Sequence, residues 1–354
     1  MGPFNINPKD ALDEVSRFTQ KLTASTKVLR EVDDVTYGAT EKEEIYREDK
    51  LVLYRFKGDK TPTAKVPILI VYALVNRPFM TDLQADRSLV RNLLAHGEDV
   101  YLIDWGYPDA ADRYTSLDDY INGYIRRCVD QVARRHDLAK INILGICQGG
   151  AFSLCFSAIY PEKVQNLITM VTPVDFHTPD NMLSQWTQGI DVDQFVNTLG
   201  NVPGDLMNFC YLMLKPFRLN HQKYIGLVDI LDDKHELENF LRMEKWIFDS
   251  PDQAGQAFRE FIRDFYQGNK LIEGGLKIGK KDVNLKNITM PVLNIYAEQD
   301  HLVPPSASMP LKDVVGTKDY TVLAFKGGHI GIYVSGRAQR EVAPTIHSWL
   351  SKRG

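Results

Sequence analysis

Short runs of apolar and β-branched residues recur along the chain from Leu51 onward, and longer stretches with helical spacing separate them. Strands joined by helical crossovers predict an α/β fold with a mostly parallel sheet covered on both faces. The first run can form an antiparallel edge strand. The predicted strands are LVLYRF (51–56), VPILIVY (66–72), DVYLID (99–104), INILG (141–145), LITMV (167–171), PVLNIYA (291–297) and YTVLAF (320–325).

This alternation stops between Thr172 and about Ile288, where the chain becomes helical and aromatic. Such an insertion between two strands predicts a helical cap, or lid, over the carboxyl ends of the strands. The alternative is a set of extra packing helices. Asn7 and Asp10 can cap a separate helix near the N-terminus. The predicted division is an N-terminal helical segment (1–45), an α/β core (46–174 and 286–354) and an inserted helical cap (175–285).

Composition narrows the class of protein without naming a function. The chain has 354 residues, 44% of them hydrophobic and 25% charged, and a net charge of -4 that gives no electrostatic case for nucleic acid. The four cysteines form no regular framework, so a reducing cytoplasm is expected. The N-terminus lacks the apolar core of a signal peptide, which argues against secretion. The longest apolar run, residues 66–75, is far shorter than the roughly 20 residues of a transmembrane helix.

The stretch ILGICQGGA (143–151) places Cys147 between a buried strand and a helix. Gly145 and Gly149 keep side chains away from a sharp turn, and Gly150 and Ala151 let the helix approach the sheet closely. The helix dipole then favours the thiolate. This is the nucleophile elbow of an α/β-hydrolase fold, with Cys where most elbows carry Ser. The alternative is a buried structural cysteine.

An elbow nucleophile needs a base and an acid, which in this fold follow it in the order acid, then histidine. Asp300 follows the strand PVLNIYA, and His329 follows YTVLAF. His329 would take the thiol proton, and Asp300 would hold its tautomer and orientation. His301 is the competing histidine, but residues adjacent in sequence cannot easily form the base–carboxylate contact.

An oxyanion hole needs two backbone donors. The N–H of Gln148 directly follows the nucleophile, and the second donor is expected in the segment ALVNR, at Val75. The alternative is that ALVNR is a simple strand exit. No metal site is expected, because neither a CxxC pair nor an HExxH motif is present.

Several other features have ordinary structural explanations. Cys128 and Cys155 are expected to pack in helices, and Cys210 in the cap. An aromatic stripe at helical spacing, Phe258, Phe261 and Phe265, is typical of core packing. The paired bases are typical of solvated faces, although one pair could meet the phosphates of coenzyme A. They are Arg126 and Arg127, Arg134 and Arg135, and Lys280 and Lys281.

A thiol nucleophile changes what the enzyme can do with an acyl group. A serine would turn a thioester substrate into an oxoester, whereas a cysteine turns it into another thioester and keeps the acyl group activated. A Cys elbow therefore fits an acyltransferase that holds the acyl unit until a hydroxyl substrate arrives.

The chain resembles the polyhydroxyalkanoate synthases over nearly its whole length, and its length resembles the short catalytic subunit of the class III enzymes; class IV matches less well. The motifs that carry the resemblance are GICQGGAFSL, LIVYALVNRPFMTDLQ, VYLIDWGYPD, SLDDYINGYI, MVTPVDFHTPDN, FLRMEKWIFDSPDQAG, QDHLVPP and GGHIGIYVSG.

The resemblance implies an enzyme that polymerises (R)-3-hydroxyacyl-CoA, typically 3-hydroxybutyryl-CoA, with release of coenzyme A and without a cofactor. It implies Cys147 as the acylated residue, His329 as its base, and Asp300 as the acid that orients His329 or helps it to activate the 3-hydroxyl. A second subunit of different sequence, a homodimer and the surface of polyester granules are the implied partners.

The residues alone lead only to a Cys-nucleophile enzyme that acts on an acyl compound. A thioesterase or dienelactone-type hydrolase with the same three residues is the enzymatic alternative, since it would deliver the acyl group to water. A catalytically idle granule-coating or scaffold protein is the non-enzymatic one.

Overall fold

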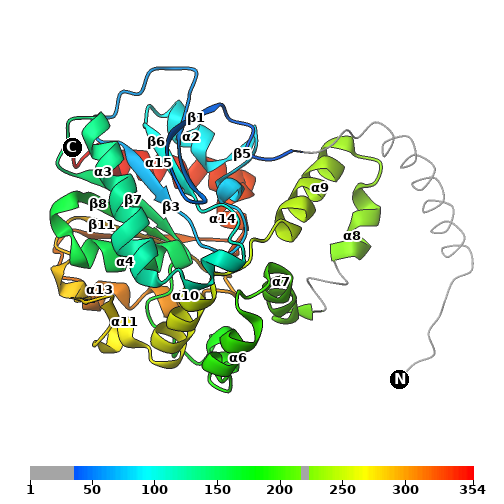
Figure 1. Cartoon of the computed structure of the whole chain (residues 1–354). Helices are drawn as coiled ribbons and strands as arrows, with labels where there is room; N and C mark the ends of the chain where they lie inside the picture. The colour runs from blue at the N-terminus through cyan, green and yellow to red at the C-terminus, as the bar shows by residue number, and fades with distance from the viewer. Residues whose placement is uncertain (1–35, 217–222) are drawn as a thin grey trace, which may run out of the picture.

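Residues 36–216 and 223–354 are described by the computed structural model, and within them eight strands form one twisted sheet (Figure 1). The strand order is β1-β2-β6-β3-β7-β8-β11-β12. Of these, β2 runs antiparallel to its neighbours, and the pairs from β6 to β12 are parallel. The bounds are β1 Lys42–Glu48, β2 Leu51–Phe56, β3 Ile68–Val71, β6 Val100–Asp104, β7 Ile141–Ile146, β8 Val164–Met170, β11 Val292–Ala297 and β12 Tyr320–Phe325.

The seven predicted strands are confirmed, but the prediction that LVLYRF lies at the sheet edge is wrong. It forms β2, and the edge is β1, whose sequence KEEIYRE is too charged to show an apolar pattern. β1 also lies partly in the range 1–45 that was predicted to be helical. The predicted caps Asn7 and Asp10 lie outside the described residues.

Two of the predicted paired bases hold this edge strand in place. Arg127 bonds Glu48 at 2.5 Å, and Arg135 bonds Glu43 at 2.9 Å. Both arginines belong to α3, which packs beside the sheet, so ion pairs attach a strand that has few apolar side chains. Arg127 and Arg135 therefore form their hydrogen bonds with glutamates of β1.

Helices cover both faces of the sheet, as the pattern predicted. Helices α3 (Arg126–Arg135) and α4 (Gln148–Ile159) pack on one face, and α2 (Leu89–Ala95) and α15 (Gly336–Leu350) pack on the other (Figure 1). Each helix contributes buried apolar side chains to the core cluster on its own side. The strands between them are buried on both faces, which explains their continuous apolar runs.

Most of the insertion between β8 and β11 is helical. Its helices α6, α7 and α10 lie along one end of the body, and α8 and α9 stand to one side (Figure 1). Two residues in each of β9 and β10 form a small hairpin that the sequence pattern did not predict. The bounds are α5 Met182–Thr187, α6 Val192–Leu199, α7 Gly204–Met213, α8 Lys223–Ile230, α9 Lys234–Phe248, α10 Gly255–Glu260, η6 Phe261–Gln267, α11 Lys270–Glu273, β9 Lys277–Ile278 and β10 Lys281–Asp282.

The remaining elements are short connections within the core. A second small hairpin, β4 with β5, was also not predicted. Their bounds are η1 Pro78–Thr81, β4 Asp82–Gln84, β5 Arg87–Ser88, η2 Ala110–Tyr114, η3 Asp119–Ile125, η4 Pro161–Lys163, η7 Leu285–Asn287, α12 Pro305–Ser308, α13 Leu311–Val314 and α14 Gly331–Val334.

The aromatic stripe of the insertion packs against the core. Phe261 meets Phe152 of α4 edge to face, with ring centroids 5.8 Å apart, and Phe265 meets Phe176 in the same way. Such pairs add to the free energy gained by burying the rings. These contacts confirm the predicted packing role of Phe261 and Phe265. The Phe261–Phe152 contact holds one end of the insertion against α4, the helix that follows Cys147.

Candidate active site

Cys147 lies on the turn between β7, which ends at Ile146, and α4, which begins at Gln148. Its backbone has φ 53° and ψ -123°, a conformation that residues other than glycine rarely adopt. The turn is held because the Cys147 N–H donates to the carbonyl of Met170 on β8 at 2.9 Å. The side chain is half-buried at the N-terminus of a 12-residue helix.

Two glycines after Cys147 allow this turn because their neighbours leave no room for a side chain. A Cβ on Gly149 would lie 2.3 Å from the Val71 carbonyl oxygen of β3. A Cβ on Gly150 would lie 1.8 Å from Oγ1 of Thr172. The close approach of α4 to the sheet, expected from the sequence, therefore depends on both residues.

His329 and Asp300 meet at the carboxyl ends of β12 and β11, respectively. Nδ1 of His329 lies 2.7 Å from Oδ2 of Asp300, and both side chains are buried. The other carboxylate oxygen, Oδ1, accepts the backbone N–H groups of Leu302 and Val303 at 2.8 and 3.0 Å. Asp300 is thus oriented by its own loop, and its resolved histidine partner is His329 rather than the adjacent His301.

Cys147 lies close enough to His329 to interact with its ring electrostatically. Because Nδ1 faces Asp300, Nε2 is the ring nitrogen left for the thiol. Burial lowers the pKa of His329, but Asp300 and Cys147 outweigh it and raise that pKa to about 10. The structure therefore brings all three residues together and favours a protonated imidazole between two groups that can carry negative charge.

Four tyrosines lie near Cys147. They are Tyr72 after β3, Tyr211 of α7, Tyr266 of η6 and Tyr333 of α14. Burial raises the pKa of each hydroxyl, and a negative charge on Cys147 raises it further. They therefore stay neutral and can donate hydrogen bonds, and two of them come from the insertion.

The backbone of the predicted oxyanion segment is held by two glutamine side chains. The Leu74 N–H donates to Oε1 of Gln148 at 3.0 Å, and the Leu74 carbonyl accepts from Nε2 of Gln253 at 2.8 Å. Val75, the predicted donor, is the next residue and packs on the same core cluster as Cys147. Neither side-chain role was predicted from the sequence, because the partners lie far apart in the chain: Gln148 is 74 residues from Leu74 and Gln253 is 179 residues from it.

The remaining cysteines are separate from this site. Cys128 and Cys155 are buried, and burial raises the pKa of both thiols well above the usual range. Cys210 is half-buried in α7, and burial raises its pKa as well. Among residues 36–216 and 223–354, no group of three or more His, Cys, Asp or Glu side chains could hold a metal ion.

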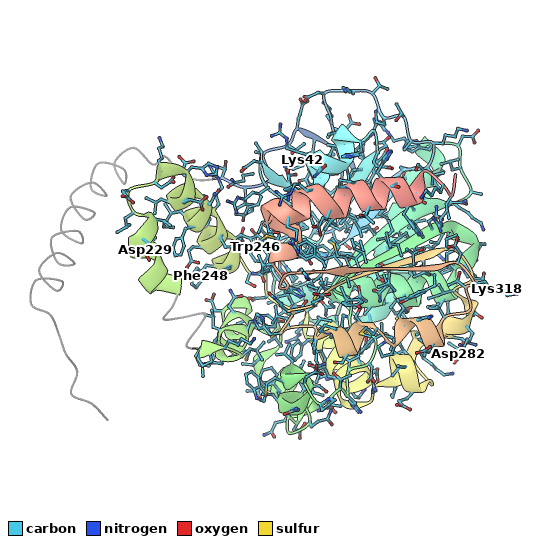
Figure 2. All side chains as sticks on the ribbon, turned by 180° about the vertical axis from the view of Figure 1, so that it is seen from behind. Lys42, Asp229, Trp246, Phe248, Asp282 and Lys318 are labelled. Atoms are coloured by element: carbon cyan, nitrogen blue, oxygen red, sulfur yellow. The ribbon has the colours of Figure 1, made fainter. Side chains whose placement is uncertain are left out.

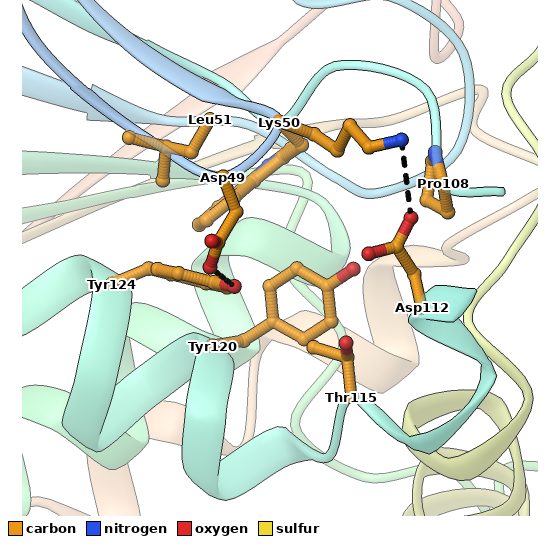
Figure 3. Close-up of a pocket in the computed structure, with 9 residues that line it drawn as sticks. Asp49, Lys50, Leu51, Pro108, Asp112, Thr115, Tyr120 and Tyr124 are labelled. Carbon is orange, nitrogen blue, oxygen red and sulfur yellow. Dashed lines mark hydrogen bonds and ion pairs between the residues drawn. The ribbon is translucent and has the colours of Figure 1, made fainter.

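A small hollow lies elsewhere, beside the turn from β1 to β2 (Figure 3). Two pairs of its polar groups contact each other: the Tyr124 hydroxyl donates to Asp49 at 2.6 Å, and the Lys50 ammonium lies 3.7 Å from Asp112. With these groups already paired, the hollow offers little to a ligand, and the chemistry gathers at Cys147.

The sheet has eight mostly parallel strands, and Cys147 and the Asp300–His329 pair lie at the carboxyl ends of those strands. These features define the alpha/beta hydrolase fold. The family model for that fold matches residues 66–335 of the chain. Within that fold, the chain belongs to the family of poly(3-hydroxyalkanoate) polymerase subunits. It is 59% identical over 355 residues to the subunit PhaC of Allochromatium vinosum, covering all of both chains.

Other relatives agree with this assignment. The chain is 50% identical over 364 residues to the poly(3-hydroxyalkanoate) polymerase subunit PhaC of Synechocystis, covering 100% of this chain and 96% of that one. Among solved structures, the monoacylglycerol lipase of Paleococcus ferrophilus aligns with a TM-score of 0.52 at 17% identity, covering 85% of this chain and 99% of the lipase. That likeness concerns the fold alone.

Proposed function

We propose that this chain polymerises (R)-3-hydroxyacyl-CoA, with 3-hydroxybutyryl-CoA as the expected substrate, and releases coenzyme A. The observation that carries the proposal is the strained Cys147 in contact with the His329–Asp300 pair. The names of the relatives support polymer synthesis rather than another acyl transfer.

In the first step, the Cys147 thiolate attacks the thioester carbonyl, and the thiol proton resides on His329. Backbone N–H groups of Gln148 and Val75 stabilise the oxyanion that forms. When the intermediate collapses, its carbon–sulfur bond to coenzyme A breaks, and the leaving thiolate takes the proton from His329. The acyl group is now a thioester on Cys147.

In the second step, the 3-hydroxyl of another unit attacks this thioester. Its proton passes to His329, whose charge Asp300 stabilises, and an ester bond forms as Cys147 leaves as thiolate. Because the enzyme-bound species is a thioester, little acyl activation is lost before the hydroxyl arrives. No cofactor takes part, since the coenzyme A thioester is the substrate and coenzyme A the product.

We also propose the setting in which this chemistry takes place. The chain acts as a class III catalytic subunit in the cytoplasm, with a second subunit of different sequence, as a homodimer, at the surface of polyester granules. The word subunit in the relatives' names supports a partner. No helix in the described parts of the chain is long and apolar enough to cross a membrane.

The test is to incubate the purified chain, with and without the partner subunit, with 3-hydroxybutyryl-CoA and to identify where the acyl group goes. Insoluble polyester that is lost in Cys147→Ala and Cys147→Ser supports the synthase. Soluble free acid would make the chain a thioesterase instead, and no release of coenzyme A would favour the scaffold.

A further inference from the structure

We infer that Gln253, a residue of the inserted cap, positions the oxyanion hole by holding the peptide between Leu74 and Val75 in one orientation. The inference deepens the proposed function and rests on it for the identity of the oxyanion donors. Gln253 does not touch the reacting atoms, so its role is that of a positioning residue.

The geometry of a peptide bond connects Gln253 to the Val75 N–H. The described residues contain no cis peptide bond, so the Leu74 carbonyl and the Val75 N–H point in opposite directions across one rigid plane. Nε2 of Gln253 donates to that carbonyl at 2.8 Å. The hydrogen bond on one side of the plane therefore sets the direction of the N–H on the other side.

The preceding peptide is fixed from the opposite direction. The Leu74 N–H donates at 3.0 Å to the side chain of Gln148, the residue next to the nucleophile. The elbow thus holds one side of Leu74 and the cap holds the other. With both sides of Leu74 held, the segment has little freedom to rotate between ground state and transition state, which is the preorganisation that oxyanion stabilisation requires.

Gln253 is itself rigidly placed. It is 4% exposed, and its backbone forms an isolated antiparallel bridge with Val202, with N–H to carbonyl distances of 2.8 and 2.9 Å. The residue before Gln253 is also held in place, because the Gly204 N–H donates to Oδ1 of Asp252 at 3.0 Å. Because Gln253 is buried and its backbone is fixed by hydrogen bonds, its side chain holds the oxyanion segment in a defined place relative to the cap.

Neighbouring cap residues hold the rest of the same segment. Nδ2 of Asn76 donates to the Ile247 carbonyl at 3.0 Å, and the Trp246 indole donates to the Arg77 carbonyl at 2.7 Å. The segment 74–77 therefore meets cap residues 246–253 at three points. Of these, Gln253 contacts the peptide that bears the predicted donor.

The experiment uses Gln253→Met, which keeps the shape but loses the donor, and Gln253→Glu, whose ionised carboxylate cannot donate. In the full chain, the first-turnover acylation of Cys147 is measured with 3-hydroxybutyryl-CoA and with p-nitrophenyl butyrate. Alkylation of Cys147 by iodoacetamide is measured in parallel, because that reaction needs the thiolate but forms no oxyanion.

We expect the acylation of Cys147 by either substrate to slow about 10- to 100-fold in both variants. This loss is somewhat smaller than that caused by removing a whole hydrogen-bond donor from an oxyanion hole. KM and the alkylation rate should stay within about twofold of the parent. The matched control is Gln267→Met: this cap glutamine also donates to backbone carbonyls, those of Thr187 and Ile190, but does not contact the oxyanion segment. Its acylation rate should match the parent.

Unchanged acylation in both Gln253 variants would overturn the inference. So would an alkylation rate that falls in proportion to acylation, because the substitution would then disturb the Cys147–His329 pair. A parent chain that releases no coenzyme A would instead count against the proposed function. The p-nitrophenyl ester would still decide the role of Gln253, since an oxyanion develops from any ester.

Discussion

At the scale of single residues, Cys147 has a strained backbone conformation, with φ 53° and ψ -123°. A non-glycine residue held in a sparsely populated region of φ and ψ costs on the order of 1–3 kcal/mol, and here β7, β8 and α4 hold it there. The conformation presents the thiol to His329. Asp300 then fixes the imidazole through a hydrogen bond, so three residues from three loops come together at one site.

The raised pKa of His329 predicts a dependence of stability on pH. A proton bound more tightly in the folded than in the unfolded protein stabilises the fold below the ordinary histidine pKa, and this contribution is lost as pH rises toward about 10. Between pH 7 and 10, each unit of rising pH removes part of this contribution and lowers the free energy of unfolding by at most about 1.4 kcal/mol.

Asp300→Asn should make this decline shallower, because a neutral amide cannot hold the proton on His329. The measurement is urea unfolding at a series of pH values in that range. Asp319→Asn is the control, since its ion pair with Arg353 lowers the pKa of Asp319 and it does not titrate there. Equal slopes for the parent and Asp300→Asn would contradict the prediction.

Between elements, the approach of α4 to β3 sets the position of both Cys147 and the segment 74–77. Gly149 makes this approach possible because its Cα faces the backbone of β3. A backbone atom cannot turn away as a flexible side chain can. The two elements would have to separate to admit even a methyl group, and the distance from Cys147 to Val75 would change with them.

Gly149→Ala should therefore destabilise the fold by about 3 kcal/mol, at the upper end of the usual cost of overpacking. Equilibrium unfolding in urea measures this change. Gly189→Ala is the matched control, because the nearest atom to its new Cβ, the Trp186 carbonyl oxygen, would be 4.0 Å away. The control should stay within about 0.5 kcal/mol of the parent, and a similarly small change in Gly149→Ala would contradict the close approach.

Across the whole molecule, the insertion between β8 and β11 meets the core at residues 74–77. Figure 2 shows Trp246 where α9 meets the body, and Asp229 on α8 farther out. Asp249, just after α9, accepts hydrogen bonds from the hydroxyls of Tyr37 and Tyr107, and both of these tyrosines belong to the core side of the junction. A change at this junction should therefore affect α9 before it affects the sheet.

Trp246→Phe tests this arrangement. It removes the donor to the buried Arg77 carbonyl, which should cost about 1–3 kcal/mol. Hydrogen exchange should rise in residues 234–248, while the central strand β7 keeps its protection. Phe248→Leu is the control, because Phe248 is 55% exposed at the end of the same helix. Equal loss of protection in α9 and β7 would show that the two regions unfold together.

The sequence by itself determined the seven apolar strands, their coverage by helices, and the three residues Cys147, Asp300 and His329. These features are readable because each depends on a local pattern: a continuous apolar run, a glycine-lined turn, or a polar residue directly after a strand. The contact between the three residues then follows, because the carboxyl ends of parallel strands lie at one edge of the sheet.

The tertiary structure alone decided the features that depend on distant partners. β1 is a strand because β2 offers it a ladder and arginines of α3 bind its glutamates, although its own sequence has no apolar pattern. Gln253 acquires its place on the Leu74 carbonyl only when the insertion packs against the core. Pairings of this kind leave no periodic signal, because what stabilises them is a hydrogen bond or an ion pair to a residue far away in the chain.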